Sequence, residues 1–143
     1  MRITIHGAAG EVTGSSHLLS FGKQQVLLDC GLHQGGREDE ARNSEEFPFD
    51  VDSLDAVVIS HAHIDHIGRL PLLVKRGYRG PVFTHRATAD LARIMLEDSA
   101  QLAAADAERH NRRRLREGLP ADDAPLYSAL DVADTLGLLR GID

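Results

Sequence analysis

The chain has 143 residues, of which 42% are hydrophobic, so we expect one globular domain or part of one. Its net charge of −6 supplies no overall basic field, and any contact with nucleic acid would therefore depend on a local patch. No apolar run approaches the roughly 18 residues of a membrane span and no signal-peptide core is present, which predicts a cytoplasmic protein without a membrane segment.

The beginning of the chain is rich in β-strand signals. Short runs of Ile, Val and Leu occupy 2–7, 16–21 and 25–30. Glycine-containing breaks at 10–15 and 31–36 separate or follow these runs. We therefore predict three strands, with the two breaks as loops at the ends of a sheet.

The middle of the chain has a β–α–β order. The segment 55–60, "DAVVIS", predicts a buried strand, and 81–85, "PVFTH", predicts another. Between them, 67–77 predicts a helix that is interrupted or restarted near Pro71. This order favours an α/β layered fold.

Two further helices are predicted towards the end of the chain. The first runs from Thr88 to about Arg116, where "EGLP" stops it, because apolar residues recur at helical spacing. The second begins at Ser128, whose hydroxyl can cap the helix, with Asp131 in the capping-box position. The apolar positions of the first helix are Leu91, Ile94, Met95 and Leu102.

The stretch "SHAHIDH" at 60–66 holds three of the eight histidines of the chain at the end of an apolar run. In an extended strand end, His61 and His63 point to the same side and can present their imidazoles to one metal ion. Asp65 and His66 follow where the chain turns into the next helix, whose N-terminal end favours a carboxylate. Two ligand pairs on one tight turn predict two neighbouring metal ions, an arrangement suited to phosphodiester hydrolysis.

The alternative interpretation is a histidine-rich loop that arose by chance, which we expect in roughly two or three chains per thousand of this composition. Asp29 favours the metal site, because an acidic residue that ends the apolar run "VLLD" needs a partner when it is buried. A hydrogen bond to a metal-ligating histidine is one such partner, and capping of its own turn is the other interpretation.

These motifs carry a family resemblance. "HAHIDH" after an apolar strand, with "LLDCG" some thirty residues earlier, resembles the metallo-β-lactamase superfamily, whose signature is His-x-His-x-Asp-His. The segments "GAAGEVTGSSHLL", "LLDCGLHQGG" and "GYRGPVFTHRATADLARIMLEDSA" resemble its β-CASP branch of RNA-processing nucleases. That branch includes the cleavage and polyadenylation nuclease subunit with its bacterial and archaeal relatives, and the resemblance covers nearly all of residues 1–102.

The resemblance implies an α/β fold of the αβ/βα sandwich type, two zinc ions (Zn²⁺) and hydrolysis of RNA. Position by position, it implies that His61 and His63 bind the first zinc and that Asp65 and His66 bind the second. Asp29 would orient the cluster, so Asp65 and Asp29 are the predicted catalytic carboxylates. RNA is then the expected partner of the full-length protein.

The family completes its site with a further histidine, a bridging aspartate and a last histidine beyond an inserted β-CASP domain, none of which has a counterpart in 1–143. We therefore expect a partial metallo-β-lactamase-fold domain, the N-terminal half of the sandwich, without the β-CASP domain. It would belong to a longer protein or pair with another copy. The other histidines are weaker candidate ligands: His6, His17, His33, His85 and His110.

Two other functions stay open at this point. One is a different hydrolase of the same superfamily that acts on a small ester or thioester, because the histidine motif is shared. The other is a non-catalytic metal-binding fragment, because the downstream ligands are missing. The flanking segments quoted above favour the nuclease.

Two features outside the motif have competing interpretations. "RHNRRRLRE" at 109–117 holds five arginines, which could contact RNA phosphates, but a solvated helix face is the favoured interpretation. Cys30, the single cysteine, is expected to be a small buried residue rather than a redox sensor, and it excludes both an internal disulfide and a thiolate zinc site.

Overall fold

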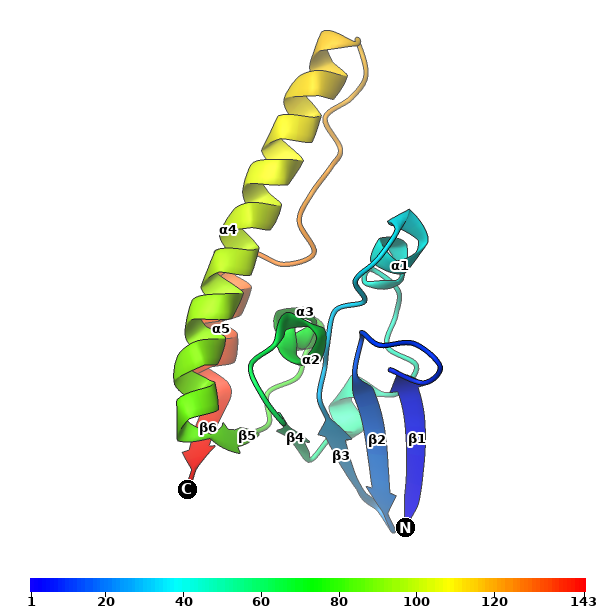
Figure 1. The fold of residues 1–143 in the computed structure, drawn as a ribbon, viewed down its shortest axis with the longest axis vertical. Coiled ribbons are helices and arrows are strands. Elements are labelled where there is room, and N and C mark those ends of the chain that lie inside the picture. Colours follow the sequence, from blue (N-terminus) through cyan, green and yellow to red (C-terminus); the bar gives the residue numbers. More distant parts are fainter.

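One mixed six-stranded sheet in the order β1-β2-β3-β4-β5-β6 organises the fold (Figure 1). The computed structural model describes the backbone of residues 1–143 and every side chain except that of Arg37. Strands β1 to β3 are antiparallel, and β3 to β6 are parallel. The strands are β1 (Arg2–Gly7), β2 (Ser16–Phe21), β3 (Gln24–Leu28), β4 (Ala56–Val58), β5 (Val82–His85) and β6 (Leu139–Ile142).

Along the chain, all the helices lie between strands of the parallel part, from β3 to β6. In Figure 1, α4 and α5 stand side by side at the β5–β6 end of the sheet, and the far end of α4 extends well beyond the sheet. This arrangement agrees with the expected α/β class and half-sandwich. The helices are α1 (Arg37–Arg42), the 3-10 turn η1 (Val51–Ser53), α2 (Ile64–Ile67), α3 (Leu70–Lys75), α4 (Arg86–Arg116) and α5 (Ala129–Leu138).

Several predicted elements are confirmed. The strands predicted at 2–7 and 16–21 match β1 and β2, and the helix predicted at 67–77 restarts near Pro71, since α2 ends at Ile67 and α3 begins at Leu70. The predicted cap of α5 is also present: the Ser128 hydroxyl accepts a hydrogen bond from the Asp131 amide at 3.3 Å, and the Asp131 carboxylate accepts one from the Ser128 amide at 2.7 Å.

Two predicted strands are too long, and three elements were not predicted. The strand predicted at 25–30 ends at Leu28, because Asp29 adopts a left-handed backbone conformation with φ of 61°. The strand predicted at 55–60 is reduced to β4, although the Ile59 amide still donates to the Phe83 carbonyl of β5 at 2.9 Å. The sequence analysis missed α1, η1 and β6, and β6 begins at Leu139 directly after α5 ends at Leu138, with no loop between them.

The two faces of the sheet differ in burial. Leu18, Leu27, Val57 and Val82 lie opposite one another on neighbouring strands and are buried. The opposite face is open, because Ile3 and Ile5 of β1 keep 54% and 56% of their surface exposed. Its other apolar members, which are partly buried, are Leu19, Val26, Leu28, Val58 and Phe83.

Helix α4 packs with a different face from the one that its large apolar residues suggest. Leu91, Ile94 and Leu102 are 56%, 63% and 59% exposed. The buried positions are instead Ala92, Leu96, Ala100 and Ala107, so small alanines allow the helix to approach the core closely.

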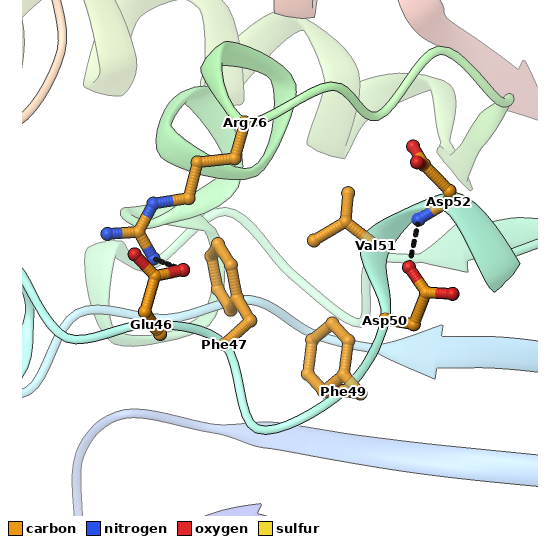
Figure 2. A pocket seen from close by; sticks show the side chains of 7 residues that line it. All are labelled: Glu46, Phe47, Phe49, Asp50, Val51, Asp52 and Arg76. Atoms are coloured by element: carbon orange, nitrogen blue, oxygen red, sulfur yellow. Dashed lines mark hydrogen bonds and ion pairs between the residues drawn. The ribbon is translucent and has the colours of Figure 1, made fainter.

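The segment between α1 and β4 is held by two arginines. The Arg69 guanidinium lies 4.5 Å and that of Arg76 5.3 Å from the centre of the Phe47 ring. Both guanidinium groups also donate hydrogen bonds to the Glu45 carbonyl, at 2.8 and 2.7 Å. Figure 2 shows Arg76 beside Phe47 in a hollow of about 360 Å³. The hollow shares no residue with the histidine motif; it is lined by Glu46, Phe47, Phe49, Asp50, Val51, Asp52 and Arg76.

A clamp around His33 joins the loops that follow β1 and β3. The His33 amide donates to the Asn43 side chain at 2.8 Å, and that side chain donates to the His33 carbonyl at 2.9 Å. The buried His33 ring lies against Gly14, where any side chain would overlap it. Arg42 and Glu11 form a two-point ion pair, at 2.6 and 3.0 Å, that closes the clamp.

We predict that Leu96→Ala lowers the free energy of unfolding by about 2–5 kcal/mol, because it removes a fully buried side chain. Leu91→Ala on the same helix is the matched control and is expected to change it by less than about 0.5 kcal/mol, because Leu91 is exposed. Urea unfolding of the two variants measures both values. A larger loss for Leu91→Ala would place the core face of α4 on the other side.

The pH dependence of stability tests the burial of His33. Burial lowers the pKa of His33 below its usual value of 6.5, and the nearby Arg42 adds to this effect. The unfolded chain therefore takes up a proton at a higher pH than the folded chain does, and stability falls as the pH drops below about 6.5. The other charged groups that face His33 are Glu11, Arg69 and Asp39.

We predict that His33→Gln reduces the loss of thermal stability between pH 7.5 and pH 5.5 relative to the unmodified chain. Burial also lowers the pKa of His6, with His17 adding to the effect, so His6→Gln is expected to act in the same direction. The lowered pKa of Glu11 acts at more acidic pH and does not contribute in this window. Equal losses in the unmodified chain and in both variants would contradict the prediction.

Candidate metal centre

The histidine motif occupies the turn from β4 into α2. The chain leaves β4 at Val58, bends at Ser60 and Ala62, is extended at His63, whose φ and ψ are −69° and 146°, and then forms the single turn of α2. Asp65 and His66 lie within that turn. The predicted position of the motif, at the carboxyl end of a strand and at the start of a helix, is confirmed.

Backbone hydrogen bonds hold this turn against two other segments. The Ser15 amide donates to the Asp65 carbonyl at 2.9 Å, and the Cys30 amide donates to the His66 carbonyl at 2.8 Å. Gly31 lies so close that any side chain there would overlap the Asp65 carbonyl. The short α2 is therefore positioned by its neighbours, since one helical turn is not stable by itself.

The four predicted ligands form one connected cluster. The rings of His61 and His63 are 4.6 Å apart between their centres and nearly perpendicular, at 73°. The rings of His61 and His66 are 3.9 Å apart. The Nε2 atom of His66 lies 3.5 Å from Oδ2 of Asp65. His63 is exposed and the other three side chains are partly buried, so the cluster faces solvent.

Asp29 lies beneath this cluster and is only 3% exposed. Its Oδ2 atom is 2.8 Å from Nδ1 of His66, so the predicted contact with a motif histidine is confirmed. The same oxygen accepts hydrogen bonds from the hydroxyls of Ser15 and Ser60, at 3.0 and 2.9 Å. Its other oxygen, Oδ1, accepts from the Ser60 amide at 2.8 Å. Asp29 therefore does more than cap its own turn.

The donor set suits a metal ion in part. Two donor atoms on one tetrahedral zinc lie about 3.3 Å apart, and the observed 3.5 Å between His66 and Asp65 is close to this spacing. The bond from His66 Nδ1 to Asp29 leaves Nε2 of that ring free to coordinate. Among the described side chains, however, no three of His, Cys, Asp or Glu are arranged around one point as an ion requires. The ligand roles stay predictions.

The weaker candidate residues have other contacts. His85 caps α4 by accepting a hydrogen bond from the Ala87 amide at 3.2 Å, and His110 pairs with Asp123 at 2.9 Å. Cys30 is buried, as expected, and burial raises the pKa of its thiol to about 12.

The arginine-rich end of α4 is largely neutralised by its own neighbours. Arg109, Arg113 and Arg114 pair with nearby carboxylates at 2.7, 3.0 and 3.0 Å, and Arg112 pairs with Glu108. These pairs agree with the favoured interpretation, a solvated helix face. In the described structure, none of the helices has the length and apolar composition to cross a membrane.

Sequence reasoning missed Ser15 and Ser60, which both bond to Asp29. Ser60 stands directly before the first motif histidine, and this adjacency was the available signal. Nothing in the sequence indicated Ser15, which reaches the site only through the fold.

Comparisons with known proteins extend this picture. The chain is 46% identical over 143 residues to ribonuclease TTHA0252 of Thermus thermophilus, covering 100% of this chain and 28% of that protein. It is 38% identical over 149 residues to the transcription termination factor FttA of Cenarchaeum symbiosum, covering 96% of this chain and 22% of that protein. It is 36% identical over 105 residues to Integrator complex subunit 11 of Danio rerio, covering 68% of this chain and 17% of that protein.

The chain thus spans less than a third of the length of each of these relatives. They confirm the resemblance to the β-CASP branch, and the chain matches their N-terminal part. A profile described as the metallo-beta-lactamase superfamily, whose members generally bind metal ions, matches residues 9–134. The chain therefore belongs to the metallo-beta-lactamase superfamily.

Proposed function

We propose that this chain is the N-terminal part of a zinc-dependent nuclease that hydrolyses RNA phosphodiester bonds. The observation that carries the proposal is the buried Asp29 carboxylate 2.8 Å from His66, whose free nitrogen lies 3.5 Å from Asp65. A carboxylate that orients an imidazole in this way is typical of a metal site. The relatives named as a ribonuclease and as a transcription termination factor support RNA as the substrate.

The proposed roles follow the arrangement of the side chains. His61 and His63 would hold one ion, Asp65 and His66 the other, and Asp29 would fix the ring of His66. When bound, the two zinc ions would activate a water molecule and stabilise the charge of the phosphodiester.

One observation favours a different candidate, a non-catalytic metal-binding segment. The pair of Asp65 and His66 has the spacing of ligands on one ion, but no three described side chains surround a common point. In the proposal above, the remaining ligands come from beyond these residues, since the relatives are much longer than the matched part. The part of the longer protein that supplies these ligands, rather than a second copy of this chain, would also cover the open sheet face around Ile3 and Ile5.

We predict that residues 1–143 alone bind zinc weakly and do not cleave RNA measurably. Two histidines supply half of a tetrahedral shell, whereas a catalytic zinc normally has three protein ligands besides its water. Calorimetric titration with zinc and an assay with labelled RNA, run beside His63→Ala, measure both properties. Robust cleavage by the chain that is lost in His63→Ala would show that the site is already complete.

A chimera tests the nuclease directly. Residues 1–143 would replace the matching segment of the Thermus thermophilus ribonuclease, to which they are 46% identical over their whole length. We predict that the chimera binds zinc and cleaves RNA, and that His63→Ala in the chimera abolishes cleavage while the protein stays folded. A small ester and a thioester serve as competing substrates. Hydrolysis of these without RNA cleavage, or a folded chimera without activity, would contradict the proposal.

A further inference from the structure

Ser60 lies at the centre of the polar contacts beneath the histidines. Its amide donates to Oδ1 of Asp29 at 2.8 Å, and its hydroxyl donates to Oδ2 of the same carboxylate at 2.9 Å. The hydroxyl oxygen is also 3.0 Å from Nδ1 of His61 and 3.3 Å from Nδ1 of His66. One serine thus contacts the carboxylate and both rings.

The number of available protons determines the direction of each hydrogen bond. An ionised carboxylate only accepts, so the single hydroxyl proton of Ser60 goes to Asp29. The hydroxyl oxygen can then only accept from His61, which requires the proton of that ring to be on Nδ1. Nδ1 of His66 is closer to Asp29 than to Ser60, at 2.8 against 3.3 Å, and donates to the carboxylate.

We propose that Ser60 is a positioning residue that extends the orienting effect of Asp29 to His61. One buried carboxylate then prepares two imidazoles, His66 directly and His61 through the Ser60 hydroxyl. Both rings then carry their proton on Nδ1, and Nε2 of each ring keeps its lone pair. The metal that these nitrogens would bind rests on the proposed function, whereas the hydrogen-bond relay does not.

Ser15 provides the contrast that separates this role from a merely structural one. Its hydroxyl also donates to Oδ2 of Asp29, at 3.0 Å, although Ser15 is buried and Ser60 is exposed. In contrast to Ser60, Ser15 has no hydrogen bond to either ring among those in the described structure. Ser15→Ala and Ser60→Ala therefore each remove one hydroxyl donor from the same oxygen, and only the second interrupts the relay.

The test measures which ring nitrogen carries the proton, in metal-free chain labelled with ¹⁵N in histidine. In the unmodified chain at alkaline pH, we expect His61 and His66 to be protonated on Nδ1. In Ser60→Ala, His61 is expected to shift to protonation on Nε2, the form that free imidazole side chains prefer, while His66 stays unchanged. Ser60→Thr keeps the hydroxyl and Ser15→Ala keeps the relay, so both variants are expected to resemble the unmodified chain. Asp29→Asn is expected to alter both rings.

Zinc titration of the same variants gives the second readout. Ser60→Ala is expected to weaken zinc binding about 10-fold or more, and Ser60→Thr to restore it. The relay is wrong if His61 in the unmodified chain carries its proton on Nε2, a result that needs no variant to fold. It is also wrong if Ser15→Ala shifts His61 as much as Ser60→Ala does. If the protonation pattern is as expected but the chimera described above binds no zinc, the relay stands and the proposed function fails.

Discussion

The carboxylate of Asp29, which is almost completely removed from water, constrains the loops around the histidine motif. Burying a carboxylate is unfavourable by several kcal/mol unless donors surround it. Asp29 is 3% exposed, and its donors come from three separate segments: Ser15 before β2, Ser60 after β4, and His66 in α2. The antiparallel and parallel halves of the sheet meet at β3, which ends immediately before this residue. Satisfying one carboxylate therefore brings the loop before β2 and the turn after β4 to the same place.

The backbone at this point carries strain that the surrounding contacts offset. Asp29 has a φ of 61°, a left-handed conformation that is unfavourable by about 1–2 kcal/mol for residues other than glycine. Its amide still donates to the Val58 carbonyl at 2.9 Å, and the Cys30 amide donates to His66 at 2.8 Å. The turn directs the carboxylate back under the motif, and Gly31 then lets α2 approach without a side chain between them.

The parts of this site that depend on neighbouring residues in the chain could be predicted, whereas the parts that depend on the fold could not. The spacing of His61, His63, Asp65 and His66 is local, so their position at a strand end was confirmed. Ser15 is far from the motif in sequence, and nothing in the sequence linked it to Asp29. In α4, large residues at 91, 94 and 102 suggested a core face, but the close approach that alanine allows decided which side is buried.

The division between the orienting groups and the predicted ligands has a physical consequence. Ser15 and Asp29 are buried, and Ser60, which is exposed, joins them through its hydrogen bonds to Asp29 and contacts the ring of His61. On the other side, the rings of His61 and His66 are 3.9 Å apart between their centres, and Nε2 of His66 lies 3.5 Å from the carboxylate of Asp65. A carboxylate that bonds to one nitrogen of an imidazole fixes the orientation of the ring and leaves the other nitrogen to act as a ligand. The charge that orients the cluster is therefore buried at Asp29, whereas the predicted ligands belong to side chains that are partly buried or, for His63, exposed.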